Sequence, residues 1–181
     1  MFGVLSRNPC GKQTSLKIAL TGPESSGKTY LANYISQKYG YFLIDEYSRT
    51  FLEALMVPYR LDDVIHMAQE QHRRIISSHE SKIVVDTESI VSKIWLEEKY
   101  GKQFDWLEDQ ILNEQFDLYF LCAPDIPWEY DPLRENPHDR DRLFDLFKNE
   151  LDERKLSYQI ISGNEEQRQK MVDEIMYKLE N

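Results

Sequence analysis

The sequence predicts an α/β fold in which a five-stranded, mainly parallel sheet carries helices on both faces. Five short apolar runs are rich in β-branched or aromatic residues and are each too short for a helix: residues 16–20, 41–44, 83–85, 118–121 and 158–161. Segments with apolar residues at helical spacing lie between these runs, and such alternation implies crossover units. A glycine-rich phosphate-binding motif directly after the first run is the third observation that predicts this class.

The chain length and the position of the first run predict the domain organisation. With 181 residues, the chain is expected to form one domain over residues 16–181, preceded by an N-terminal tail over residues 1–15. Residues 124–142 are expected to form a lid within this domain, for the reasons given below. Parallel sheets of this kind bind ligands outside the carboxyl ends of their strands.

The net charge and the cysteine content indicate which kinds of partner and which cellular compartment to expect. The net charge of −10 argues against nucleic acid, which usually meets a basic surface, and against anionic membranes. No apolar run approaches the roughly 20 residues of a membrane span, and the N-terminus lacks the apolar stretch of a signal peptide. Cys10 and Cys122 show no metal-ligand spacing. We therefore expect a cytoplasmic protein with reduced thiols.

A phosphate-binding loop follows the first predicted strand. Glycines at both ends allow backbone N–H groups to turn toward phosphate oxygens, and the following helix adds its positive end. The lysine supplies a point charge for the β- and γ-phosphates, and the last hydroxyl is a ligand for Mg²⁺. A nucleoside triphosphate, expected to be ATP, with Mg²⁺ is therefore the predicted ligand. The loop fits G-x-x-x-x-G-K-[ST] at every fixed position: Gly22, Pro23, Glu24, Ser25, Ser26, Gly27, Lys28 and Thr29.

Two carboxylates follow the second and third predicted strands, so both are expected near the phosphate loop. Asp86 ends an apolar run, which is the Walker B pattern, and is expected to serve Mg²⁺ beside Thr29. The alternative is that Asp86 caps a helix over residues 87–100. Glu46 is expected to orient the attacking hydroxyl, with an ion pair to Arg49 on the next helical turn as the alternative.

The lid over residues 124–142 follows the fourth strand and contains four prolines, which forbid an ordinary helix through it. Arg134 and Arg140 are expected to close over the phosphates and neutralise charge that develops during transfer. Arg142 is a weaker candidate for the same task, and Trp128 and Tyr130 are candidates to stack on a ring. The alternative is a solvated loop in which the arginines pair with neighbouring acids, namely Glu135, Asp139 and Asp141.

The segment after the last strand is the remaining candidate for nucleotide contact. The loop at this place in nucleotide kinases often borders the adenine, and Arg168 is placed to lie over it. The alternative is a simple turn that caps the next helix.

Five motifs occur in order along the chain: the phosphate loop at residues 22–29, Glu46-Tyr47-Ser48-Arg49, Asp86-Thr87-Glu88, Pro127-Trp128 and Asp131-Pro132-Leu133-Arg134. Together they resemble the ribosylnicotinamide kinase domain of NadR-type proteins, a P-loop kinase of NAD salvage. The resemblance covers the chain from about Leu16 to the C-terminus. The combination of the Gly-Xaa-Glu-Ser-Ser-Gly-Lys loop with the two acidic motifs is much more specific than the loop alone.

The resemblance implies a P-loop kinase fold and ATP-dependent phosphorylation of the ribose 5′-hydroxyl of nicotinamide riboside. It places the substrate-side acid at Glu46, the Mg²⁺-side acid at Asp86, and the lid cations at Arg134 and Arg140. The pyridinium ring of such a substrate suits acidic and aromatic neighbours. The residues expected at the substrate are therefore Glu46, Tyr47, Arg49 and Trp128.

Two other functions fit the same motifs. One is a kinase for another nucleoside or a vitamin-like alcohol. The other is a regulatory module that hydrolyses ATP slowly and reports to a partner. The lid arginines and the acid after the second strand favour the kinases.

Overall fold

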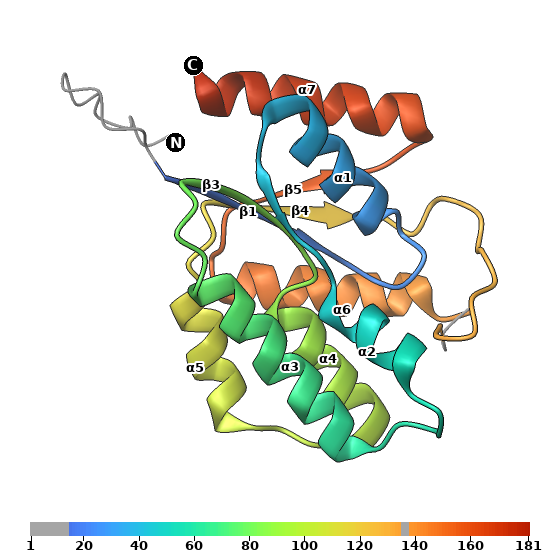
Figure 1. The fold of residues 1–181 in the computed structure, drawn as a ribbon. Helices are drawn as coiled ribbons and strands as arrows, with labels where there is room; N and C mark the ends of the chain where they lie inside the picture. The colour runs from blue at the N-terminus through green and yellow to red at the C-terminus, as the bar shows by residue number, and fades with distance from the viewer. Residues whose placement is uncertain (1–14, 135–137) are drawn as a thin grey trace.

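The computed structural model describes residues 15–134 and 138–181, and its centre is a sheet of five parallel strands (Figure 1). The five strands all run parallel, in the order β2-β3-β1-β4-β5, which confirms the predicted five-stranded parallel sheet. Each predicted run matches a strand to within one residue at either end. The strands are β1 (Leu16–Thr21), β2 (Phe42–Ile44), β3 (Lys82–Asp86), β4 (Leu118–Cys122) and β5 (Tyr158–Ile161).

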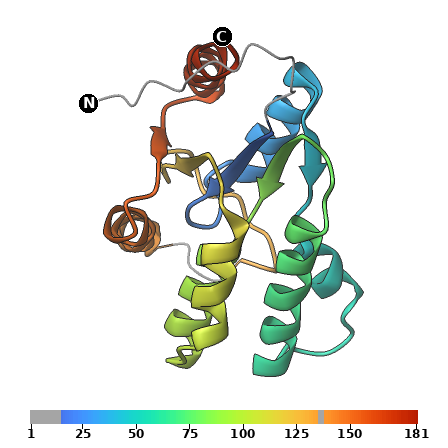
Figure 2. The same cartoon turned by 90° about the vertical axis from the view of Figure 1, so that its left-hand side faces the viewer.

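Helices connect all five strands and cover both faces of the sheet. α1 and α7 lie on one face, and α3 to α6 extend from the other (Figure 1, Figure 2). The helices are α1 (Lys28–Tyr39), α2 (Tyr47–Ala54), α3 (Leu61–Ile76), α4 (Ser89–Tyr100), α5 (Asp105–Glu114), α6 (Arg140–Glu153) and α7 (Glu165–Glu180).

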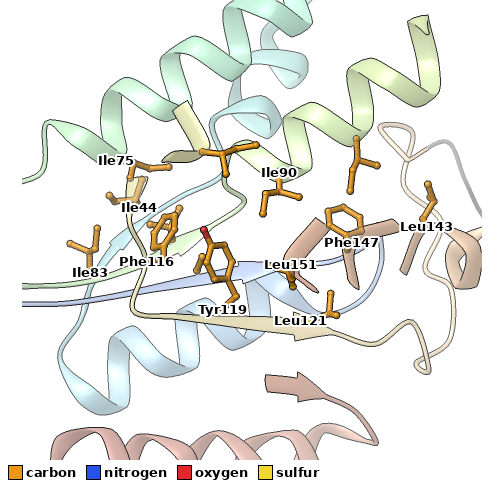
Figure 3. Packing of buried hydrophobic residues seen from close by; sticks show 14 residues of the cluster. Ile44, Ile75, Ile83, Ile90, Phe116, Tyr119, Leu121, Leu143, Phe147 and Leu151 are labelled. Carbon is orange, nitrogen blue, oxygen red and sulfur yellow. The ribbon is translucent and has the colours of Figure 1, made fainter. Parts of the chain in front are cut away.

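The core is split by the sheet because successive side chains of a strand point to opposite faces. On β1, Ile18 and Leu20 pack with α1 and α7, whereas Ala19 packs on the other face. That second cluster joins β3 and β4 to α3, α4 and α6, with Phe147 and Leu151 of α6 near its centre (Figure 3). Burial on both faces explains why the strands are almost continuously apolar.

The topology brings the chemistry to one edge of the sheet. β3 pairs with β1 and β2 pairs with β3, so their carboxyl ends lie side by side. The phosphate loop follows β1, Asp86 ends β3, and Glu46 comes two residues after β2. The predicted lid segment starts after β4 at the same edge, and its last residues, from Arg140, form the first turn of α6.

The predicted tail, including Cys10, lies outside the described residues apart from Ser15, and Cys122 is buried at the end of β4. Within residues 15–134 and 138–181, no helix has the length and apolar character that crossing a membrane requires.

Candidate active site

The phosphate loop packs closely against the end of β4. Gly22 has a φ of 125°, and a Cβ atom at this position would lie 2.7 Å from the backbone oxygen of Cys122. Only glycine therefore fits there. Gly27 also has a positive φ, 83°, at the point where the loop enters α1. These two residues give the loop its turn.

Lys28, the first residue of α1, folds its side chain back across the loop. Its Nζ donates to the backbone oxygens of Gly22 at 2.9 Å and Pro23 at 2.8 Å. Ser26 closes the turn, since its hydroxyl donates to the Pro23 oxygen at 2.7 Å. The ammonium group therefore lies inside the turn of the loop, where phosphate oxygens are expected.

Asp86 lies beside Thr29, whose side chain favours the ionised form of the Asp86 carboxyl. Burial raises the pKa of the Asp86 carboxyl to about 6, and the nearby Glu46 carboxylate adds to the rise. The Oδ1 atom of Asp86 is buried and has no hydrogen-bond partner among the described residues. Such an orphaned oxygen beside a hydroxyl fits a hard divalent cation.

The Asp86 carboxyl and the Thr29 hydroxyl place two kinds of oxygen donor side by side. Within residues 15–134 and 138–181, no group of three or more His, Cys, Asp and Glu side chains gathers as metal ligands. Mg²⁺ typically takes one or two protein oxygens and completes its shell with phosphate and water. Thr29 and Asp86 are therefore the residues that would hold it.

The alternative role of Asp86 as a helix cap is wrong, because Glu88 caps α4. The Glu88 carboxylate accepts from the backbone N–H of Ile90 at 2.6 Å and from the Thr21 hydroxyl at 2.7 Å. Complete burial, together with the nearby Glu114 carboxylate, raises the pKa of Glu88 to about 8. Glu88 thus connects β1 to α4 and leaves Asp86 for the site.

Glu46 lies at the start of α2, and its carboxylate accepts from the Ser48 hydroxyl at 2.6 Å. The alternative partner, Arg49, points to the lid: its Nη2 lies 2.7 Å from Asp131 Oδ2, and its Nη1 lies 3.6 Å from Glu53. Arg49 therefore joins α2 to the lid.

The two predicted lid cations lie against the phosphate loop. Arg134 Nη1 donates to the Ser25 hydroxyl at 3.3 Å, and Arg140 Nη1 donates to the Ser25 backbone oxygen at 3.0 Å. Both guanidinium groups also lie over the Trp128 ring, at 6.0 and 5.7 Å from its centroid. The lid is thus placed with two positive charges at the mouth of the loop.

The other lid residues are placed differently. Arg142 pairs with Asp139 and with Glu98 of α4. For this arginine, the alternative in which the lid arginines pair with neighbouring acids therefore holds. Its alternative partner Glu135 lies outside the described residues. Tyr130 is 86% exposed and is not among the described residues that line the cavity below.

Arg168 is buried under the loop instead of lying open beside a base. Its guanidinium donates to the backbone oxygens of Ser26 and Ala123, each at 2.8 Å, and pairs with Asp125. Its Nε donates to the Gly163 oxygen at 2.7 Å. This placement favours a supporting role for Arg168 beneath the nucleotide.

A cavity of about 840 Å³ runs from the phosphate loop to the helices on the far side. One part of its lining is the phosphate loop together with Tyr30, Glu165 and Arg168. Another part is formed by residues of α2, α4 and the segment before α2, including Glu46, Arg49, Leu52, Val91, Ile94 and Trp95. One continuous space therefore joins the phosphate loop to a region where the apolar residues Leu52, Val91, Ile94 and Trp95 lie among charged ones, Glu46, Arg49, Glu98, Lys99 and Arg142.

The sequence did not single out this apolar wall. Trp95 lines the cavity as well as packing against Tyr59, with ring centroids 5.6 Å apart. Conversely, Tyr47 and Trp128, which were expected at the substrate, are not among the described residues that line the cavity. Tyr47 faces α3, where the Arg74 guanidinium lies 4.3 Å from its ring centroid. The sequence did offer one signal for the α4 residues that line the cavity: α4 starts shortly after β3, the strand that ends in Asp86.

The sequence of the chain matches a known protein family. A family model described as an AAA domain matches residues 17–168, which is most of the chain and includes the loop, both acids and the lid. The chain belongs to this family.

The AAA domain is also similar to NadR proteins, which confirms the resemblance drawn from its motifs. It is 23% identical over 150 residues to the trifunctional NAD biosynthesis/regulator protein NadR of Escherichia coli. That match covers 78% of this chain but 37% of the E. coli protein, so the chain spans little more than a third of that relative's length.

Two solved NadR structures share the fold of the AAA domain at 20% identity. One is a complex with NR, with a TM-score of 0.68 over 88% of this chain. The other is a complex with NAD and AMP-PNP, with a TM-score of 0.69 over 90% of this chain. Each match covers 49% of the NadR chain.

The raised pKa of Asp86 predicts a pH-dependent affinity for Mg²⁺. Because the folded-state pKa of about 6 lies above the ordinary value of 3.8, ionising this carboxyl destabilises the free protein as the pH rises through that window. A bound cation removes the penalty, so Mg²⁺-dependent nucleotide affinity should increase as the pH rises through about 6.

Isothermal titration calorimetry with the nucleotide at several pH values measures this effect. Asp86→Asn should weaken the pH dependence and leave the part due to ionisation of the nucleotide's own terminal phosphate, whereas Glu80→Gln, a change at an exposed residue before β3, should retain all of it. The same pH dependence in Asp86→Asn and in wild type would contradict the assignment.

Proposed function

We propose that this domain is an ATP-dependent kinase that phosphorylates the ribose 5′-hydroxyl of nicotinamide riboside and yields nicotinamide mononucleotide. The observation that carries the proposal is one cavity lined both by the phosphate loop and Glu46 and by side chains of α2 and α4 that include Leu52, Ile94 and Trp95. A simple hydrolase needs no such second region. The similarity to NadR proteins, one of them solved with NR, supports this choice of substrate.

The chemistry of this second region suits a flat cationic ring attached to a sugar. Leu52, Val91 and Ile94 supply apolar surface, and the Trp95 ring supplies a face with negative electrostatic potential. Glu46 adds a carboxylate at the boundary with the phosphate site. These aromatic and acidic groups support a cationic ring as part of the substrate.

The division of tasks follows from the positions of the side chains. Lys28, Arg134 and Arg140 surround the loop and would stabilise negative charge on the transferred phosphoryl group. Thr29 and Asp86 would hold Mg²⁺, which would neutralise negative charge on the triphosphate. Glu46 would accept a hydrogen bond from the 5′-hydroxyl and orient it toward the phosphate.

A coupled assay that detects ADP release, run with a panel of nucleosides, tests the proposal. Nicotinamide riboside should give the highest kcat/KM, with nicotinamide mononucleotide identified by mass spectrometry. Lys28→Ala should abolish transfer with little change in thermal stability, because its side chain serves the loop and not the core. Preferential phosphorylation of another nucleoside would replace the substrate, and nucleoside-independent ATP hydrolysis alone would overturn the kinase.

The lid makes a separate prediction about charge stabilisation. Arg140→Ala should lower kcat by roughly 10²-fold or more, while the Kd of Mg·ATP changes much less, because the guanidinium is needed most as charge moves in the transition state. Arg140→Lys should restore little activity, since an ammonium group lacks the planar fork.

Steady-state kinetics and nucleotide titration of the Arg140 variants measure this prediction. Arg73→Ala is the matched control, because Arg73 is an exposed arginine on α3 that pairs with Glu70 outside the site. A raised KM for ATP with normal kcat in Arg140→Ala would make the lid a binding element only.

A further inference from the structure

Gln71 on α3 is a buried polar residue whose amide joins two loops of the site. The residue is 5% exposed. Its Oε1 accepts from the backbone N–H of Tyr47 at 2.9 Å, and its Nε2 donates to the backbone oxygens of Thr87 at 2.9 Å and Asp86 at 3.4 Å. Both ends of one side-chain amide are therefore used, each on a different loop.

These loops carry the two acids. Tyr47 directly follows Glu46, and the other bonds are made to Asp86 and its neighbour. The ladder between β2 and β3 has its last pair at Ile44 and Val85, before either acid is reached. Beyond that pair, Gln71 continues the connection that the sheet no longer provides.

Thr87 shows that the second loop is held under strain. It has a φ of 75°, which β-branched residues rarely adopt, and its hydroxyl is buried without a hydrogen-bond partner among the described residues. Such a conformation persists only where the surroundings impose it. Two bonds do so here: the Thr87 N–H donates to the Leu20 oxygen at 3.3 Å, and Gln71 holds its carbonyl.

The side-chain amide suits this connection because one planar group carries both an acceptor, used by Tyr47, and a donor, used by Thr87. A glutamate at the same position would lose the donor to Thr87.

We propose that Gln71 is a positioning residue for phosphoryl transfer: it fixes the spacing between Glu46 and Asp86 and so aligns the acceptor hydroxyl with the metal–nucleotide complex. The inference rests on the proposed kinase function. Gln71 itself touches neither substrate, and it acts through the loops that carry the acids.

Gln71→Met removes the amide at nearly the same volume. It should lower kcat for nicotinamide riboside at least tenfold, while the Kd of ATP at saturating Mg²⁺ changes less than threefold. Gln71→Asn, which keeps the amide but is one methylene too short to reach both loops, is the milder second variant. Ile75→Val, a core truncation on the same helix away from the acids, should leave kcat within twofold of wild type.

A double-mutant cycle with Glu46→Gln separates positioning from general stability. If Gln71 acts by placing Glu46, Gln71→Met should lower kcat by a much smaller factor in the Glu46→Gln background than in wild type. A folded Gln71→Met protein with wild-type kcat, or an equal fold-loss in both backgrounds, overturns the inference.

The Mg²⁺ concentration for half-maximal ATP binding distinguishes failure of this inference from failure of the proposed function. This binding titration needs no nucleoside acceptor. The half-maximal Mg²⁺ concentration should rise more than threefold in Gln71→Met and Gln71→Asn, because the loss of the Gln71 bonds displaces Asp86. If wild type phosphorylates no nucleoside, the kinase proposal fails and this titration still tests Gln71. An unchanged value in both variants overturns its role.

Discussion

The buried guanidinium of Arg168 joins the segments that follow three different strands. Its hydrogen bonds reach Ser26 in the phosphate loop, Ala123 after β4 and Gly163 after β5, and Asp125 balances its charge. A cation in such a buried place is tolerated only when it is paired and its donors are used. The loop therefore has a fixed position relative to the sheet edge, and the site is arranged around that position.

On the opposite side of the loop, the same edge is held by neutral and acidic groups. Glu88 connects Thr21 to the start of α4, and Gln71 connects the loops that carry Glu46 and Asp86. Under the proposed function these contacts separate two tasks in space: the cations that would meet the triphosphate are Lys28, Arg134 and Arg140 beside the loop, and Glu46, which would orient the acceptor, follows β2. The strain at Thr87 lies at the boundary between them.

The strands, the loop and the sheet edge were predictable because their signals are local. Apolar runs mark strands, the loop motif is contiguous, and parallel topology places Glu46 and Asp86 together. The partners of Arg168 and Gln71 come from distant segments, so no local pattern reveals them. Gln71 did carry a signal, because it shares the apolar stripe of α3 with Ala68 and Ile75. The direction of the Tyr47 ring was not predictable either, because the ring packs against Arg74 of α3, which is distant in the sequence.

The central claim is that Asp86 serves the metal and Glu46 serves the acceptor. A Mg²⁺ titration of phosphoryl transfer in Asp86→Asn and Glu46→Gln tests it most directly. The account predicts that Asp86→Asn raises the Mg²⁺ concentration for half-maximal activity, whereas Glu46→Gln depresses transfer to the nucleoside at an unchanged Mg²⁺ requirement. A shifted requirement in Glu46→Gln alone would mean that the roles are exchanged, and full activity in both variants would contradict the mechanism.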